Sequence, residues 1–522
     1  MKRRSFLGMG LAAALAQGCK GETPPVAPRP WGTPEAYEAF AMLDSARRPE
    51  RMLEIFCLGG MSPWESFYAV PGRNQPGSGD YAEQQWWLWQ ESERLSVPDF
   101  GKQCLGLAPG SLLHPWTTDG LGNSVHLGPF VHALKSRPDM LARMRVWVMA
   151  HNTEPHENAI PYAISGHELG DPRLASLGAH LERYHREGGD PARTAPYAYA
   201  IAMSSLDVSG NGPAAWSIGQ HGPSARPMPV QLGRELRLHE QLARARVLPF
   251  RNQLDELVAY HTQQFRARLT SATSGQVRAP GLDDLALAQA ALRNHEGLAR
   301  MLPEQLLASK EIELCIPDPL EMTHGPVLDE TSTAIELARH LLTDTITPAR
   351  YVQVLDAGIF TDPAGQGYDA HSFHVETQGP NLDHMLRGLI GVVNEPGEND
   401  PSKLDLDRDF VLLNTEFGRA PYREVSLRNP YGFGSDHWPW GYVVVGFGGF
   451  IDSERSGLVG SIGADGRAVD GLTPSEHRAA MLLANGAWPF STEAFNVGDI
   501  RGATTELEAA LILRERVLGY SA

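Results

Sequence analysis

The stretch DFVLLNTEFGRAPYREVSLRNPYGFGSDHWPWGYVVVGFGGF, residues 409–450, contains the strongest fold signal in the chain. Its two apolar runs, 410–413 and 442–445, predict buried strands because they are short, continuous and bounded by polar residues or glycines. Asn414-Thr415-Glu416 follows the first run, and Ser435-Asp436-His437 precedes the second. Ligands of open α/β folds bind at the carboxyl edge of the sheet. The pattern therefore predicts an α/β fold with a polar, metal-binding site at that edge.

Other segments extend this fold prediction. Apolar runs predict further strands at residues 52–58, 146–150, 197–203 and 351–356. Residues 34–47, 381–393, 474–485 and 505–518 are predicted helices. Alternation of strands and helices is typical of a doubly wound, mostly parallel sheet with helices on both faces. We expect one such domain over residues 34–522.

A long helical insertion is expected within this domain. Apolar residues recur at helical spacing over residues 231–270 and 283–307, among many Arg, Glu and Gln residues. These segments contain no candidate for chemistry. They predict a helical insertion at about residues 229–310 that packs against the sheet.

Polar side chains also follow the predicted strands at 52–58 and 146–150. The first strand ends at Gly59-Gly60, where glycines allow the backbone to approach a ligand, and Ser62 and Glu65 lie in the loop that faces it. The second strand runs into a segment that contains His151 and His156. A single histidine is more often a packed or capping residue, but its position at another strand end favours a site.

The triplet Asp369-Ala370-His371 follows the predicted strand at 351–356, and His374 comes shortly after it. Carboxylate oxygen and neutral imidazole are good ligands for zinc, manganese or iron. Parallel strands bring their carboxyl ends to one edge of a sheet. We therefore expect one cluster of metal ligands, and His374 is expected beside it, where replacement is better tolerated. The expected ligands are Asp369, His371, Glu416, Asp436 and His437.

The same residues also have a purely structural interpretation. Glu416 and Arg419 would form an ion pair that fixes a loop, and Asp436-His437 would form a turn. Acids and histidines held together need a cation or hydrogen bonds to offset their charge. The cluster is therefore expected to be compensated by a metal ion, by Arg419 or by both.

Residues 1–19, MKRRSFLGMGLAAALAQGC, predict an export signal. The paired Arg3 and Arg4 resemble the signal that the twin-arginine translocase reads, and the apolar run is too short to remain as a membrane span. Cys19 ends a sequence typical of a lipoprotein cleavage box, which predicts a lipid anchor; simple cleavage nearby is the alternative. Residues 20–33 are then a Pro-rich tether, and the protein is expected in the periplasm or cell envelope.

Composition narrows the class of protein. The chain has 522 residues, of which 42% are hydrophobic, so it can bury a large core. Its net charge of -17 makes nucleic acid an unsuitable partner, because phosphate binding needs a basic surface. Besides Cys19, the cysteines are Cys57, Cys104 and Cys315, which allow at most one disulfide and contain no metal-type C-x-x-C pair.

In their order and spacing, several of these motifs resemble the exported bacterial family catalogued as domain of unknown function 1501. The motifs are the twin-arginine leader, Gly59-Gly60-Met61-Ser62, Asp369-Ala370-His371, Thr415-Glu416-Phe417-Gly418-Arg419 and Ser435-Asp436-His437. The resemblance covers about residues 50–490, and the Glu-Phe-Gly-Arg and Asp-His motifs are its most specific part. That family is similar in fold to the alkaline phosphatase superfamily, which includes sulfatases and cofactor-independent phosphoglycerate mutases.

The resemblance implies a doubly wound sheet with metal-binding Asp and His residues at strand ends. By position, Asp369 and His371 are implied as one metal pair and His437 as the last histidine ligand. Glu416 stands where the superfamily has the Asp of an Asp-His pair.

The chain also departs from the superfamily pattern. Gly59-Gly60 replaces a metal-binding Asp, and the related family pattern has an Asp where this chain has Glu65. Phe417 replaces an expected histidine. His156 stands where Ser, Thr or Cys should attack, and histidine does not form the stable ester intermediate that serine forms. These departures leave either a one-metal variant or a non-catalytic relative.

Two functions are therefore expected as alternatives. The first is a metal-dependent hydrolase of phosphate or sulfate esters outside the cytoplasm, which acts on an anionic small molecule or glycan. Its candidate catalytic residues are His156 as base or nucleophile, Arg419 as partner of the anionic group, and Ser62 in the facing loop. The second is a binding or assembly protein of the cell envelope that retains the fold without the chemistry.

Overall fold

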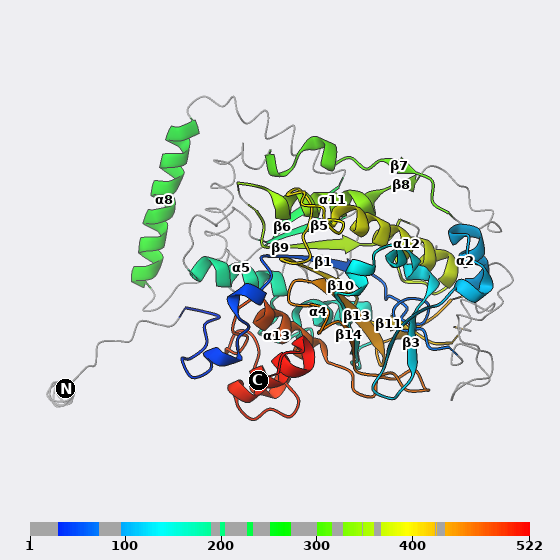
Figure 1. Ribbon diagram of the computed structural model, residues 1–522. Coiled ribbons are helices and arrows are strands. Elements are labelled where there is room, and N and C mark those ends of the chain that lie inside the picture. The colour runs from blue at the N-terminus through cyan, green and yellow to red at the C-terminus, as the bar shows by residue number, and fades with distance from the viewer. Residues whose placement is uncertain are drawn as a thin grey trace, which may run out of the picture.

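The computed structural model describes most of the chain after residue 29 (Figure 1). The described residues are 30–71, 96–188, 199–203, 227–232, 251–272, 300–315, 327–346, 348–359, 367–422, 424 and 434–521. The predicted export signal, Cys19 and most of the tether lie outside them.

An eight-stranded mixed sheet forms the centre of an α/β fold, in the order β14-β4-β13-β10-β1-β9-β5-β6. In chain order the strands are β1 (Arg51–Cys57), β4 (Met144–Met149), β5 (Tyr199–Met203), β6 (Met228–Gln231), β9 (Tyr351–Asp356), β10 (Asp409–Asn414), β13 (Tyr442–Gly448) and β14 (Gly457–Val459). The pairs β1–β10, β1–β9, β5–β9, β5–β6 and β14–β4 are parallel, whereas β13 is antiparallel to both β10 and β4. All strands of this sheet except β13 therefore share one direction.

Side chains of the central strands alternate between two buried cores, one on each face of the sheet. In β1, Leu53 and Ile55 belong to one core, and Met52 and Phe56 belong to the other. Successive strand residues point to opposite faces, so a strand buried on both sides reads as a continuous apolar run. This is why these strands are recognisable in the sequence.

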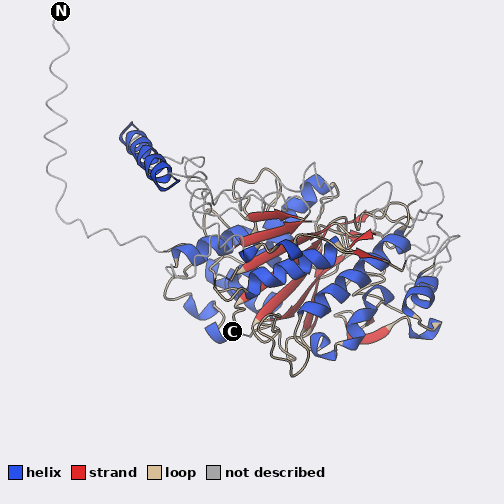
Figure 2. Cartoon of the chain, turned by 90° about the horizontal axis from the view of Figure 1, so that it is seen from above, coloured by secondary structure: helices blue, strands red, loops and turns tan. Residues whose placement is uncertain are grey.

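Helices cover both faces of the sheet (Figure 2). The first core is covered by α2 (Val97–Leu105), α11 (Glu330–Thr343) and α12 (His374–Val392). The second is covered by α4 (His156–Ser165), α5 (Leu177–Glu187), α13 (Pro474–Ala484) and α14 (Glu506–Ile512). Thr473 and Glu476 form a capping box at the beginning of α13, with Pro474 as its first residue.

The antiparallel direction of β13 differs from the expectation that parallel strands flank the site. Register pairs Phe410 with Gly448 and Leu413 with Val445, so β13 starts where β10 ends. Residues that precede β13 consequently lie at the carboxyl edge of the other strands.

The predicted helical insertion needs two corrections. Residues 228–231 belong to the sheet as β6, so an insertion expected from about residue 229 can begin only after this strand. The long helix α8 (Arg251–Ala272) stands apart from the sheet in both views (Figures 1 and 2) and exposes Leu257, Tyr260 and Phe265. It therefore does not pack against the sheet as expected. The second predicted segment, 283–307, is described only from residue 300.

Two predicted helices have different bounds. Residues 34–47 contain only short 3-10 turns, at Ala39–Ala41 and Ser45–Arg47, instead of one helix. The helix predicted at 381–393 begins earlier, at His374, and contains Pro380 in its interior. Proline usually ends a helical pattern, so the sequence placed the start of α12 after it.

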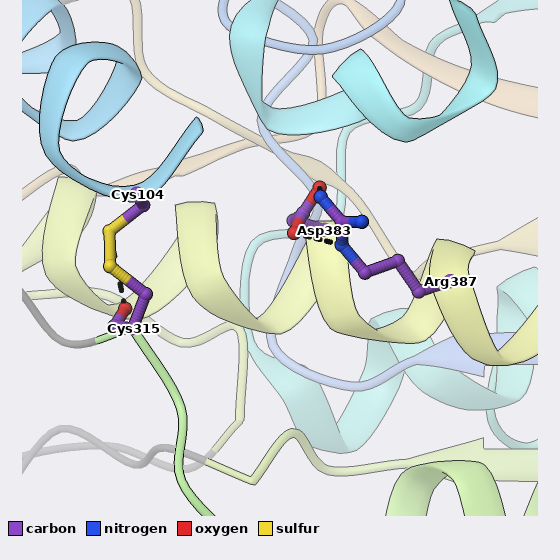
Figure 3. The surroundings of a disulfide bond; sticks show 4 residues. All are labelled: Cys104, Cys315, Asp383 and Arg387. Carbon is purple, nitrogen blue, oxygen red and sulfur yellow. Dashed lines mark hydrogen bonds and ion pairs between the residues drawn. A yellow bond between two sulfur atoms is a disulfide. The ribbon is translucent and has the colours of Figure 1, made fainter. Parts of the chain in front are cut away.

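One disulfide joins Cys104, in α2, to Cys315, which precedes β8 (Val327–Leu328) (Figure 3). Cys57, at the end of β1, is buried with a free thiol. These pairings agree with the expectation of at most one disulfide. Among the described helices, none combines the length and the apolar character needed to cross a membrane.

Candidate metal centre

The candidate site lies at the carboxyl edge of the sheet. His156 follows β4, Asp369 and His371 follow β9, and Glu416 follows β10. His437 precedes β13, and it reaches the same edge because β13 runs in the opposite direction. Side chains from distant parts of the chain therefore meet at one place.

Asp369 is at the centre of this group. Its Oδ1 lies 3.1 Å from His371 Nε2 and 3.3 Å from His437 Nε2, and its Oδ2 lies 3.3 Å from His156 Nε2. The Nε2 atoms of His371 and His437 are 3.0 Å apart. The side chains of the four residues are between 16% and 27% exposed, so a small molecule can reach them. Three imidazoles thus direct the same ring nitrogen toward one carboxylate.

A further carboxylate lies behind two of these imidazoles. His156 Nδ1 is 2.9 Å from Glu416 Oε1, and His371 Nδ1 is 2.7 Å from Glu424 Oε2. A proton on Nδ1 that is donated to a carboxylate leaves Nε2 as the atom that can bind a cation. Carboxylate–histidine pairs of this kind support the ligands of many metal sites.

Glu416 was predicted as a metal ligand, but its oxygens are used by the protein. Oε1 accepts hydrogen bonds from the backbone N of Gly59, at 2.8 Å, and from His156, and Oε2 accepts one from Thr415 Oγ1, at 3.2 Å. Its side chain is fully buried. We therefore assign Glu416 to the orientation of His156.

Arg419 is also fully buried, and it pairs with Asp369. Its guanidinium donates to Asp369 Oδ1, to the carbonyl oxygen of Gly59 and, over 2.8 Å, to the carbonyl oxygen of Ser435. This geometry agrees with the expectation that Arg419 compensates the charge of the cluster, and it replaces the alternative in which Arg419 pairs with Glu416. Arg419 holds Asp369 in place instead.

The paired glycines after β1 bring two strand ends into contact. Gly59 has φ +116°, and a Cβ at this position would lie 2.1 Å from the backbone N of Asp369. Only glycine tolerates both the positive φ and this close approach. The glycine pair therefore positions the Asp369 loop through backbone packing.

Burial and neighbouring charge act in opposite directions on the pKa values of the site. Burial lowers the pKa of His156, but Asp369 and Glu416 outweigh it and raise this pKa to about 9. His371 behaves in the same way, and Asp369 and Glu424 raise its pKa to about 9. Burial raises the pKa of Asp369, but Arg419 and the imidazoles hold it well below its ordinary value.

The pKa of His437 is shifted the other way. Burial lowers it, and the positive charges of Arg419 and His156 add to that effect. The ring of His437 stacks on Phe417, with centroids 4.3 Å apart. A neutral, well-oriented imidazole is the form that binds a metal ion.

These residues could hold a metal ion. Ligand atoms of His156, Asp369, His371 and His437 all lie within 4.8 Å of one another. Within the described part of the chain, the buried His156 Nε2 makes no hydrogen bond, although it lies close to Asp369, and a bound cation would satisfy it. Three imidazole nitrogens and one carboxylate oxygen suit zinc, manganese or iron.

Asp436, another predicted ligand, belongs to a neighbouring group with His371 and Glu424. It is exposed, and its Oδ1 accepts a hydrogen bond from the backbone N of His437, at 2.8 Å. The structure therefore places Asp436 beside the Asp369 group and outside it.

Ser62, a predicted catalytic residue, lies in a separate buried network. Its hydroxyl donates to Glu65, whose Oε2 is 3.3 Å from His374 Nε2. Its backbone N donates to Gln378 Oε1 over 3.2 Å. All four side chains are fully buried, so this network packs the loop after β1 against α12.

His151 supports the site from behind. Its Nε2 is 2.7 Å from the carbonyl oxygen of Glu416, and its Nδ1 accepts a hydrogen bond from the backbone N of Thr153, at 3.1 Å. Burial lowers its pKa to about 4, so the ring stays neutral at pH 7. His151 thereby ties the end of β4 to the end of β10.

Sequence reasoning missed Glu424 and gave His156 another role. Glu424 lies in a polar loop with no strand signal, and its only clue is that this loop begins at Arg419 and ends near His437. His156 was taken as a base or nucleophile because, in the family resemblance, it stands where Ser, Thr or Cys should attack. Its distance to Asp369 places it with the candidate ligands instead.

Comparisons with known proteins found no relative of this chain. No family model matches the chain, and no curated protein matches its sequence. Membership of the family catalogued as domain of unknown function 1501 therefore stays a prediction.

Proposed function

We propose that this protein is a metal-dependent hydrolase of phosphate or sulfate esters that acts outside the cytoplasm. The observation that carries the proposal is the convergence of three imidazole Nε2 atoms and one carboxylate at the partly exposed carboxyl edge of an α/β sheet. His156, Asp369, His371 and His437 would hold the ion. A divalent cation bound there would polarise an ester and lower the pKa of a bound water.

The protein's own residues prepare this site. Glu416 and Glu424 fix the ring orientation of His156 and His371, and Arg419 fixes Asp369. A histidine that binds an ion through Nε2 and a carboxylate through Nδ1 has no nitrogen left to attack an ester. We therefore withdraw His156 as nucleophile and assign the attack to water.

We further propose that the fold is that of the alkaline phosphatase-like superfamily and that the chain belongs to the family of domain of unknown function 1501. The order of the sequence motifs supports this, as do the α/β sheet with helices on both faces and the placement of Asp369, His371 and His437 at one sheet edge. The missing hydroxyl or thiol at His156 makes it an unusual member.

Export by the twin-arginine translocase is part of the same proposal. Replacing Arg3 and Arg4 by lysine should leave full-length precursor in the cytoplasm, because lysine lacks the planar guanidinium. Unchanged periplasmic yield would contradict this route.

Lipidation predicts a mature chain that begins with diacylated Cys19 and enters the detergent phase. A mature N-terminus beyond Cys19 would exclude lipidation.

A non-catalytic binding or assembly protein of the cell envelope is the second candidate. Four protein ligands are typical of structural zinc sites, whereas catalytic sites usually have three and keep a position open. The absence of a hydroxyl or thiol at the start of α4 also favours this function.

Elemental analysis and an ester screen separate the two functions. Protein purified from the periplasm without chelator should contain at least about one transition-metal ion per chain and hydrolyse p-nitrophenyl phosphate or sulfate. His156→Ala should lose both the metal and turnover, whereas His340→Ala, outside the site, should lose neither. Bound metal without turnover would favour the second function. A chain free of metal would overturn the metal-dependent proposal.

A further inference from the structure

The three imidazoles of the metal centre are held in two different ways. His156 presents its Nδ1 to the carboxylate of Glu416, at 2.9 Å. His371 presents its Nδ1 to the carboxylate of Glu424, at 2.7 Å. Among the described residues, no carboxylate lies within ion-pair distance of Nδ1 of His437, whose contact with an acid is made through Nε2. The orientation of the His437 ring therefore has another source.

Phe417 supplies an aromatic support for this ring. Its side chain stacks on His437, with ring centroids 4.3 Å apart and an interplanar angle of 28°. The centroid of the same ring lies 5.0 Å from that of His156, at an interplanar angle of 50°. The two imidazoles pack edge to face, with their centroids 4.4 Å apart. Phe417 thus contacts two of the three candidate ligand rings.

The position of Phe417 is fixed by the loops around it. Phe417 is fully buried, and Thr415 Oγ1 donates to its carbonyl oxygen over 3.3 Å. Gly60 packs against the ring, because a Cβ at this glycine would lie 2.8 Å from Cδ2 of Phe417. Gly60 also has φ +99°, a conformation that other residues rarely adopt. The absence of a side chain at residue 60 therefore makes room for the aromatic ring.

A ring packed in this way restricts the rotation of its neighbour. Aromatic rings favour offset-stacked and edge-to-face arrangements over other contacts. Groups that orient a metal ligand raise the affinity of the site for its ion. We propose that Phe417 is a positioning residue of the metal centre, which directs Nε2 of His437 toward the ion by stacking, in place of a carboxylate. This role rests on the metal binding that the proposed function requires.

Zinc affinity of the full-length chain, measured against a competing chelator, tests this role. Phe417→Leu keeps an apolar side chain but removes the ring, so the affinity should fall about tenfold or more. Phe417→Tyr keeps the ring, and its affinity should stay within about threefold of the parent's. Phe417→Met, whose flexible side chain fills more of the volume of the ring, repeats the first comparison with a smaller cavity.

Phe450→Leu is the matched control for lost packing. Phe450 is buried in the second core and lies against Phe410, with ring centroids 4.9 Å apart. It follows β13, at the edge of the sheet opposite the metal centre. Phe450→Leu should lower the thermal unfolding midpoint of the metal-free protein, as Phe417→Leu does, but it should bind zinc as the parent does.

The absorption of bound cobalt reports on the ligand itself. Cobalt(II) accepts the same nitrogen and oxygen ligands as zinc, and its visible spectrum changes with their number and arrangement. Phe417→Leu releases the His437 ring, so its spectrum should shift toward that of His437→Ala. Phe417→Tyr and Phe450→Leu should keep the spectrum of the parent. A phenylalanine that only packs the loop would leave the spectrum of Phe417→Leu unchanged.

Three results would overturn the proposal. Phe417→Leu and Phe417→Met would retain the parent's zinc affinity and cobalt spectrum, or Phe417→Tyr would lose as much affinity as Phe417→Leu. Alternatively, Phe450→Leu would lose as much affinity as Phe417→Leu, which would make the effect one of general packing. These results leave the metal site of the parent intact, whereas a parent that binds no metal contradicts the proposed function and this role together.

Discussion

Asp369 contacts one guanidinium and three imidazoles. The negative charge of Asp369 and of the two neighbouring glutamates can be neutralised in two ways. Without an ion, Arg419 and protons on His156 and His371 balance Asp369, Glu416 and Glu424. With a divalent cation, those protons leave and the ion takes over their charge. The site is therefore compatible with a stable metal-free fold, so ligand substitutions should affect metal content more than folding.

His437→Ala and His374→Ala should have opposite effects. Loss of His437 should lower metal affinity by more than the roughly 10- to 100-fold that loss of a supporting contact costs, because a ligand atom is removed. Its effect on the unfolding free energy of metal-free protein should stay near 1 kcal/mol. His374→Ala should retain the metal but lose about 1–3 kcal/mol of stability, because it removes the imidazole beside the buried Glu65.

This expectation changes an earlier interpretation of His374. The sequence places it near the ligands as a replaceable neighbour, whereas the structure places it in the buried network of Ser62 and Glu65. Metal analysis and urea unfolding of both variants check the prediction. Equal metal loss in both would contradict it.

Glu416→Gln tests whether this carboxylate orients a ligand or is one. Glutamine keeps the shape of the side chain but removes the charge that holds the Nδ1 proton of His156, so metal affinity should fall about 10- to 100-fold. Asp436→Asn is the control, because Asp436 is exposed and binds its own chain neighbour. Affinities measured against a competing chelator decide, and an equal loss in Asp436→Asn would make Asp436 a ligand.

At the scale of elements, apolar runs identified the buried strands but gave no information about strand direction. Residues 410–413 and 442–445 fall in β10 and β13, but an apolar run reads the same in either direction. Direction matters here because a residue that precedes a parallel strand would lie at the opposite edge of the sheet. His437 joins the site only because β13 is antiparallel.

The contacts between elements were less predictable than the elements. The site interpretation expected Arg419 to compensate the cluster without naming its partner, and the structural alternative paired it with Glu416, its near neighbour in sequence; tertiary packing pairs it with Asp369. Glu424 gave no signal beyond the position of its loop, because a carboxylate in a polar loop is ordinarily a solvated residue. Side-chain pairing across loops depends on loop geometry, which the pattern of apolar residues does not encode.

The disulfide between α2 and the segment before β8 should contribute to stability. It closes a loop with a sequence separation of 211 residues, and a crosslink over a long loop restricts the unfolded chain. Replacing both Cys104 and Cys315 by serine should lower the unfolding free energy by about 2–4 kcal/mol without changing metal content. Urea unfolding of oxidised protein and of the double variant measures this, and equal stability would contradict it.

At the scale of the whole molecule, the disulfide and the predicted leader are consistent with each other. Disulfides persist mainly in oxidising compartments such as the periplasm. Cys57 is buried at the end of β1, so its thiol does not compete for a disulfide with Cys104 or Cys315. A periplasmic location stays a prediction from Arg3 and Arg4, and a disulfide between Cys104 and Cys315 is compatible with it.

The response of the whole molecule to pH should reveal the exchange of protons for metal. In the metal-free fold, the pKa values of His156 and His371 are raised to about 9, whereas those of unfolded imidazoles are near 6.5. These protonated pairs therefore stabilise the metal-free fold fully below about pH 6.5. The stabilisation is lost as the pH rises through about 9.

Metal binding should show the opposite trend. An ion that displaces both protons must bind more tightly as the pH rises, by up to about 100-fold per pH unit until the pH approaches 9. Zinc titrations against a competing chelator at about pH 6.5, 7.5 and 8.5 measure the slope, and unfolding of metal-free protein at the same pH values measures the loss of stability. In His371→Gln, one proton fewer is displaced, so the slope should fall toward about tenfold per pH unit. An affinity independent of pH in the parent protein would show that these imidazoles are not the ligands.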